Sequence, residues 1–291
     1  MDLSKVNELV ENYKKEIKKY TIMIIFSVIF LVTFLILLKV HFMFFIGFVI
    51  SIIFLIYSII LDTQNASGYA SIRNKIFNKY MLPALNGSFA CFRYDKYKGL
   101  DHKMIRRLKL LDTGNSIYSD ELIEGYYRGI SFIQSSVLCE HESTDSDGDN
   151  HSCTTFSGRI IILGASLFYD EGHVHIIHHK NRNYRRLKNM RKVTLNEEVE
   201  DYYNIYVDRE DISIPKGFLA HITEIARAFP KYICSFSILN DRIYMVVEGI
   251  HRDLYNLKRL NKIDQESLES LIKQDSFLIT NTISSILGKE E

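Results

Sequence analysis

Four histidines stand close together in the segment GHVHIIHH, residues 172–179. On a β-strand alternate residues share a face, so His173 and His175 would lie on one side and His179 would join them. Three imidazoles so spaced could bind zinc or another divalent ion and support a metal-dependent enzyme. His178 falls on the opposite face, and no nearby cysteine or carboxylate pair completes the set. We therefore favour the alternative, a strand in which histidine is an ordinary half-polar residue.

A strongly basic stretch follows the histidines. It contains seven cations with no acidic residue among them, namely Lys180, Arg182, Arg185, Arg186, Lys188, Arg191 and Lys192. Such a stretch could bind an anionic membrane surface, at about 1 kcal/mol per basic residue, or a nucleotide phosphate. The third alternative, which we favour, is a solvated loop balanced by the acidic residues of segment 197–201. The whole chain has a formal net charge of only +1, so we do not expect nucleic acid as a partner.

Other motifs give weaker indications of chemistry. Segment 145–150, DSDGDN, resembles a calcium loop, but Gly148 comes at the fourth position instead of the sixth and no glutamate follows at the twelfth. It is more typical of a solvated acidic hairpin loop. No G-x-S-x-G elbow or glycine-rich phosphate loop occurs. Asp208, Glu210 and Asp211 could act as acids or bases, but their position favours a loop that enters a helix. We predict no catalytic residues and no cofactor.

Two apolar runs near the N-terminus indicate the cellular location of the chain. Residues 21–38 and 42–61 are almost free of polar side chains and are separated by only three residues. As helices of about 18 to 20 residues they would each span roughly 27 to 30 Å, which matches the hydrocarbon core of a bilayer. The runs are too long for a cleaved signal peptide, and a buried soluble hairpin would carry more polar residues on its outer face. The sequence therefore predicts a transmembrane helical hairpin.

The positive charges flanking the hairpin predict its orientation. Four lysines lie within residues 14–19, just before the first run, and Arg73, Lys75 and Lys79 follow the second, whereas the turn contains Lys39 alone. The positive-inside rule then places both flanks in the cytoplasm of a plasma or inner membrane. The four cysteines agree with this, because they show no C-x-x-C spacing and are typical of reduced thiols. Cys139 and Cys153 could face each other across a hairpin, but the compartment disfavours a stable disulfide.

The pattern of apolar and polar residues divides the whole chain into four segments. Residues 1–20 form an amphipathic lead-in helix that either lies on the membrane or continues into the first span, 21–61 are the hairpin, 62–115 a helical connector, and 116–291 an α+β domain with a mainly antiparallel sheet. The predicted helices are 62–85, stopped by Pro83 and Gly87, then 101–111, 215–229 and 265–287. The predicted strands are 126–138, 156–169, 172–177, 204–207, 232–239 and 242–247, with a two-residue turn at Asn240 and Asp241 before the last.

The chain resembles a bacterial family of two-span membrane proteins of unknown function, the domain-of-unknown-function family numbered three thousand one hundred thirty-seven. The resemblance lies in the paired spans and in four segments: YSDELIEGYYRGISFIQSSV, TTFSGRIIILG, VTLNEEVEDYYNIYVDREDISIPKGFLAHITEIARAF and YICSFSILNDRIYMVVEG. Phe156, Ser157, Gly158 and Arg159 stand where the family has an aromatic-x-Gly stretch. The resemblance implies a fold and a membrane location, and it supplies no catalytic residue.

The functional hypothesis is a membrane-anchored, non-enzymatic scaffold or interaction domain. Its partners would be the lipid bilayer and either another protein or a second copy of the chain. The first alternative is an effector that senses lipid or nucleotide phosphate through residues 180–192. The second is the metal-dependent enzyme described above.

Overall fold

The computed structural model describes residues 3–37, 44–145, 149–164, 172–182, 184, 189–194, 197–210, 212, 214–239, 242–250, 254, 260 and 262–287. Contacts divide the chain into two compact units. The first, here called the hairpin unit, comprises Met1–Ala84 and Leu257–Leu271. The second, here called the sheet unit, comprises Leu85–Asn256 and Ile272–Glu291.

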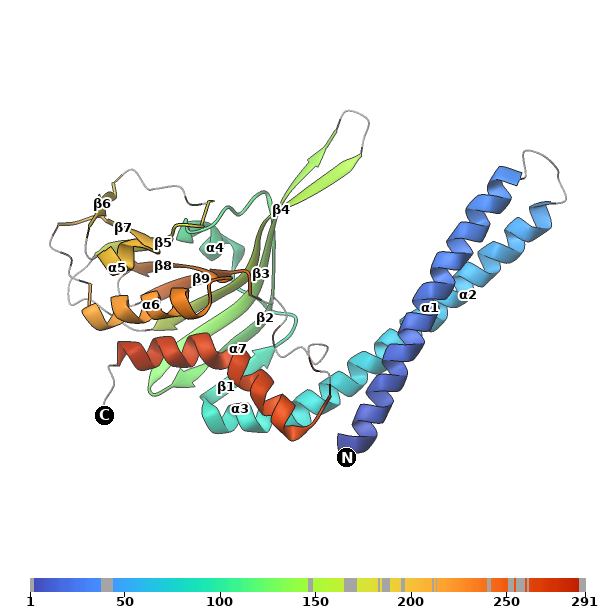
Figure 1. Cartoon of the computed structure of the whole chain (residues 1–291), viewed down its shortest axis with the longest axis horizontal. Coiled ribbons are helices and arrows are strands. Elements are labelled where there is room, and N and C mark those ends of the chain that lie inside the picture. Colours follow the sequence, from blue (N-terminus) through green and yellow to red (C-terminus); the bar gives the residue numbers. More distant parts are fainter. Residues whose placement is uncertain are drawn as a thin grey trace. The chain divides into compact units, whose positions relative to one another are not determined.

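The hairpin unit is built on two long helices, α1 (Leu3–Leu37) and α2 (Phe44–Ile76) (Figure 1). They run antiparallel, because the Phe34 ring lies against Gly47 near one end and Tyr13 lies against Gly68 near the other. Each helix is about 50 Å long at 1.5 Å per residue, so each exceeds the predicted span by several turns. The lead-in segment is continuous with the first apolar run, and the predicted helix from residue 62 continues the second.

The end of α2 differs from the prediction that Pro83 and Gly87 stop the helix. A π-helical turn, η1 (Phe77–Met81), follows α2 and leads into α3 (Leu82–Ser88), which contains both residues. The Leu82 N–H donates to the Phe77 carbonyl, a bond five residues long. Pro83 then stands in the first turn of α3, where its missing N–H costs no hydrogen bond. The prediction was wrong because the wider turn accommodates the proline ring.

The described strands of the sheet unit form one nine-stranded sheet in the order β1-β2-β3-β4-β9-β8-β5-β7-β6. Every ladder between them is antiparallel. The strands are β1 (Ala90–Asp95), β2 (Ser116–Tyr127), β3 (Ile130–Thr144), β4 (Asn150–Gly164), β5 (His173–His178), β6 (Arg191–Val193), β7 (Tyr203–Val207), β8 (Ile233–Leu239) and β9 (Arg242–Glu248). The expected antiparallel α+β architecture is therefore present.

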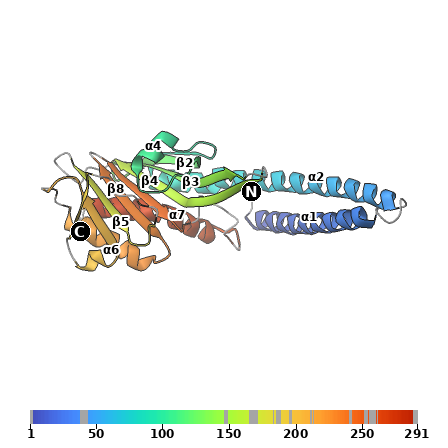
Figure 2. The same ribbon diagram turned by 90° about the horizontal axis from the view of Figure 1, so that it is seen from above.

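Helices cover both faces of the sheet (Figures 1 and 2). On the face here called the α4 face, α4 (His102–Leu108) and the residues beside it form a core with the central strands, including Ile105, Ile160 and Ile177. On the opposite face lie α6 (Lys216–Ala228) and α7 (Gln265–Ile286). Phe218 of α6 contacts Phe236 of β8 at a ring-centroid distance of 5.8 Å. A short helix, α5 (Glu197–Glu200), precedes β7.

Several predicted elements agree with the structure, and others do not. Helices α4, α6 and α7 and strands β5, β7, β8 and β9 occur where the pattern placed them, and the Asp101 carboxylate caps α4 by accepting the Lys103 N–H at 3.1 Å. The turn at Asn240 and Asp241 lies outside the described residues. Strands β1, β2 and β6 were missed. The sheet unit begins at Leu85 and not at residue 116.

The predicted strand 126–138 was wrong in its first residues. Arg128 and Gly129 have positive φ values of 48° and 83°, and they form the tight turn between β2 and β3. Paired positive φ is the backbone of a type I′ hairpin turn, which an Arg–Gly pair signals less clearly than Asn–Gly does. Most of the polar stretch predicted as a loop after residue 138 is also strand, since β3 pairs with β4 as far as Thr144 and Asn150.

Candidate functional site

Two histidines of β5 lie side by side on the α4 face. The rings of His173 and His175 are nearly perpendicular, with centroids 4.4 Å apart. His173 Nε2 is 2.9 Å from Ser237 Oγ of β8, and His175 Nδ1 is 3.0 Å from the Tyr184 hydroxyl. Strand alternation places both imidazoles together as the sequence predicted, and the neighbouring strand and loop supply their partners.

Burial keeps these imidazoles neutral. It lowers the pKa of His173 below its ordinary value, against the opposing charge of Asp208. It lowers the pKa of His175 to about 3, with a further contribution from His173. The pKa of His178, on the opposite face, falls to about 4 through burial and the nearby charges of Lys180 and His179. An imidazole with a lowered pKa is a poor proton acceptor near neutral pH, whereas its neutral ring can still bind a metal.

The structure does not bring together the three histidines considered as an alternative metal site, His173, His175 and His179. His179 follows the end of β5 and is exposed, and its backbone N–H donates to the Tyr202 carbonyl. His178 contacts the Tyr203 ring and accepts the Lys180 N–H at 3.1 Å. Across the described ranges, which include all four histidines of this segment, no group of three or more His, Cys, Asp or Glu side chains is placed to hold a metal ion.

Ser237 and His173 have the distance of a nucleophile and its base, but their surroundings favour a structural role. Ser237 is only 2% exposed and lies within strand β8, so a substrate carbonyl would have to enter the sheet to reach its Oγ. Asp208 Oδ1 accepts the His173 backbone N–H at 2.9 Å, where a catalytic carboxylate would orient the ring. The pair therefore satisfies buried polar groups between neighbouring strands.

The described part of the basic stretch is attached to the sheet unit. Lys180 Nζ donates to the Pro230 carbonyl at 3.0 Å, and the Tyr184 ring lies 5.4 Å from that of Tyr206. Arg191 forms an ion pair with Glu210. Arg182 and Lys192 are exposed. Arg185, Arg186 and Lys188 lie outside the described residues, so their predicted role stays a prediction.

The acidic run after the basic stretch has a different described partner from the one expected. Glu198 pairs with Arg227 of α6 at 2.8 Å. Sequence reasoning also missed Ser237 and Tyr184 as partners of the histidines. Ser237 alternates with Ser235 on one face of β8, a polar pattern that pointed to buried hydrogen bonding. No local signal linked Ser237 to β5, because the strand order alone brings β8 beside β5.

The predicted calcium-like loop and the cysteine pair also have defined positions. Residues 146–148 lie outside the described residues, and Asp145 Oδ2 is 3.1 Å from His151 Nε2. Cys139 is opposite Phe156 and Cys153 is opposite His141, so the two thiols do not face each other. All four cysteines are free, and Cys91 and Cys153 are exposed.

Comparison with known proteins adds little to this picture. No protein-family model matches the chain, and no curated protein matches it significantly. Among solved structures, the mycobacterial trehalose monomycolate transport factor A is similar over 65% of this chain and 88% of that chain, with 10% sequence identity and a TM-score of 0.35. At this identity and TM-score, the similarity assigns neither a family nor a function.

Proposed function

We propose that α1 and α2 anchor the chain in a bacterial plasma membrane and that the sheet unit is a non-enzymatic interaction module. The supporting observation is the distribution of side chains on the two helices, both of which are long and apolar enough to cross a membrane. Large apolar side chains point outward, with Ile25 and Phe30 each 55% exposed and Ile53 62% exposed. A hairpin folded in water would bury these residues.

The interface between α1 and α2 is lined by small and hydroxyl side chains. Ser27, Ser51 and Ser58 are buried, and each hydroxyl donates to a carbonyl four residues earlier in its own helix. Gly47 allows the Phe34 ring to approach the α2 backbone. Small and hydroxyl residues inside with large apolar residues outside is the arrangement of helix pairs in lipid.

The orientation and family remain parts of the same proposal. The lysines before the first apolar run place the N-terminus in the cytoplasm by the positive-inside rule, and the antiparallel hairpin returns the chain to that side before the sheet unit begins. The segments that resemble the two-span family of unknown function favour membership in it. The interaction role, with another protein or a second copy, completes the proposal, and Tyr126 and Leu239 are apolar residues exposed on the α4 face.

Membrane fractionation tests the anchor. The chain should remain in the membrane pellet after an alkaline carbonate wash and enter solution only with detergent. Replacing outward-facing Ile53 with Arg should weaken retention, because a charge would then face lipid. Tyr97→Arg is a matched control, since Tyr97 is 85% exposed in the sheet unit. Release of the wild-type chain by carbonate alone would contradict the anchor.

Thiol labelling tests the orientation. In a Cys91→Ser variant, Cys153 is the remaining exposed thiol of the four cysteines. A membrane-impermeant maleimide should label it only after the cells are permeabilised. Labelling in intact cells would place the sheet unit outside.

Sedimentation of gently solubilised protein tests the interaction role. We expect a defined oligomer or a stoichiometric complex. A monodisperse monomer with no partner would count against this part of the proposal while leaving the anchor intact.

A further inference from the structure

The α4 face contains a hollow of about 580 Å³ away from the histidines. It is lined by strands β1 to β4 and β9, through Cys91, Arg93, Glu124, Gly125, Tyr126, Ser131, Phe132, Ile133, Ile162, Gly164 and Arg242. Its volume lies within the range of about 300 to 1,000 Å³ typical of small-molecule sites. All of these residues belong to the sheet unit.

The sequence builds this hollow by placing small residues at its floor. Ser131 of β3 lies directly opposite Gly164 of β4, so the two share a face at the end of the β3–β4 ladder. Cβ of a residue larger than glycine at position 164 would be 2.2 Å from Ser131 Oγ. Longer side chains stand on both sides, with Tyr126 opposite Ser131 on β2 and Arg242 on β9. The small side chains of the floor and the long side chains around it together leave a depression in the sheet surface.

The floor is apolar toward the α4 core. Ile133 lies opposite Ile162, and both belong to or contact the hydrophobic cluster beneath α4. A bound molecule would therefore bury an apolar body against Ile133 and Ile162.

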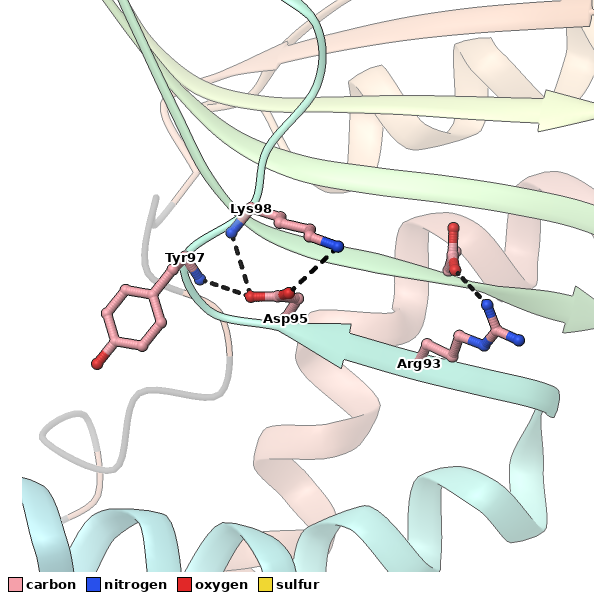
Figure 3. A network of polar contacts seen from close by, with 5 residues as sticks. Arg93, Asp95, Tyr97 and Lys98 are labelled. Carbon is pink, nitrogen blue, oxygen red and sulfur yellow. Dashed lines mark hydrogen bonds and ion pairs between the residues drawn. The ribbon is translucent and has the colours of Figure 1, made fainter.

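Two guanidinium groups stand in the walls. Arg93 and Arg242 contribute them, and Glu124 contributes one carboxylate. Arg93 Nη1 is 3.3 Å from Glu124 Oε1 (Figure 3), but the Arg93 side chain is 79% exposed. An exposed ion pair of this kind is weakly held, so the guanidinium can turn to a bound anion. Guanidinium groups bind carboxylate and sulfonate-like oxygens with two parallel hydrogen bonds.

We propose that this hollow binds a small organic anion with an apolar body, such as an aromatic carboxylate. The anionic group contacts Arg242 and Arg93, the apolar body lies over Ile133 and Ile162, and the Tyr126 ring forms one wall. The site uses neither the histidine pairs nor the basic stretch. It is independent of the membrane anchor, so either proposal can fail without the other.

Ligand-observed fluorine NMR on the full chain in a neutral detergent tests the site. The probe is para-trifluoromethylbenzoate, its uncharged control is the corresponding benzamide, and empty micelles give the background. We expect saturable binding of the benzoate at one site and about tenfold weaker binding of the benzamide, because a hydrogen bond to a charged group is lost. Absence of saturable benzoate binding, or equal binding of the benzamide, would overturn the proposal.

Variants locate the binding. Arg242→Gln should weaken benzoate binding about tenfold, and Ser131→Leu should abolish it by filling the floor. Arg107→Gln, an exposed change on α4 outside the lining, is the matched control. Thermal melts confirm that each variant is folded, and Arg242 is exposed, so its replacement leaves no buried gap. Unchanged binding by Arg242→Gln would overturn the assignment of the anionic group.

Nanodiscs distinguish a soluble anion from a lipid headgroup. If the probe binds equally in discs of phosphatidylcholine and of phosphatidylglycerol, the natural ligand is a soluble anion. If phosphatidylglycerol displaces the probe, the lipid headgroup is the anion that binds in the hollow. Both results support the anion site and assign its source.

Discussion

Arg159 of β4 and Asp275 of α7 form an ion pair in which both side chains are almost completely buried, at 1% and 2% exposure. Arg159 Nη2 donates to Asp275 Oδ1 at 2.8 Å, between residues 116 positions apart in sequence. The two charges lose their hydration on folding, so the pair positions α7 on the sheet more than it adds stability. The surrounding interface is also polar, since Gln134, Ser136 and Thr282 are buried as well.

Removing one partner of this pair should destabilise the sheet unit strongly. We expect Asp275→Leu to cost about 3 to 5 kcal/mol of unfolding free energy, because it removes the carboxylate that pairs with the buried Arg159 charge. The double variant Arg159→Met with Asp275→Leu should recover most of this loss. Chemical denaturation of the solubilised chain measures both.

The exposed pair between Glu198 and Arg227 is the control, and Glu198→Gln should change stability far less. If the double variant were no more stable than the single one, the buried pair itself would be stabilising, contrary to our account.

Two helical glycines should respond oppositely to alanine. A Cβ at Gly68 would be 2.7 Å from the Tyr13 ring, whereas a Cβ at Gly87 meets nothing within 4 Å. Alanine is about 1 kcal/mol better than glycine in a helix, so Gly87→Ala should raise the melting temperature. Gly68→Ala should lower it, because it separates α1 from α2. Combining Gly68→Ala with Tyr13→Ala should remove the clash, and an equal gain at both glycines would show that the helices are not in close contact.

Acid should destabilise the sheet unit through its buried histidines. Burial lowers the pKa of His175 to about 3 and that of His178 to about 4 from the ordinary value of 6.5. Between those values the unfolded chain binds protons that the folded chain does not. The stabilisation is therefore fully present above pH 6.5 and declines as the pH falls toward 4 and 3, by up to about 1.4 kcal/mol per pH unit for each histidine.

Denaturation curves measured from pH 4 to pH 7 test this through the slope. His175→Gln should reduce the slope of unfolding free energy against pH by the contribution of about one proton, whatever its effect on stability at neutral pH. His151→Gln, at an exposed position, controls for the general loss of a histidine. A slope unaffected by His175→Gln would mean that this imidazole is accessible to protons in the folded state.

The four thiols should fall into two reactivity classes. Cys91 and Cys153 are exposed, whereas Cys139 and Cys234 are buried. Burial raises the pKa of both Cys139 and Cys234 to about 12, with Asp112 adding to the effect at Cys139, so little reactive thiolate is present. A maleimide should add to two thiols quickly and to the other two only on unfolding, as counted by mass spectrometry. Rapid labelling of Cys234 would show that α7 or α6 leaves the sheet readily.

The amino-acid sequence by itself determined the features that depend on local patterns. Two uninterrupted apolar runs set the length and composition of the long helices. Alternation set β5, with His173 and His175 on one face, and apolar spacing over one helical face set α6 and α7. Asp101 indicated the start of α4, because aspartate is a preferred N-cap residue. Each of these signals lies within a few residues of the element that it specifies.

Other elements went unpredicted because their signals are short or mixed. Strand β1 has only six residues, and its backbone bulges where Cys91 has a φ of 51°. Strand β2 carries polar residues such as Ser119, Asp120 and Glu124 along its length, so it lacks a clear apolar alternation. The turn at Arg128 and Gly129 joined two strands that the pattern merged into one.

Only the tertiary structure decided which residues meet across the sheet. The strand order places β9 and β8 between β4 and β5, so Ser237 reaches His173 from 64 positions away. It also brings Arg242 to the same hollow as Arg93, whereas the packing of α7 on the sheet brings Asp275 to Arg159. Such contacts depend on how strands pair and on which face a helix covers, and pairing is chosen by the sum of burial over the whole sheet. No short stretch of sequence contains that sum.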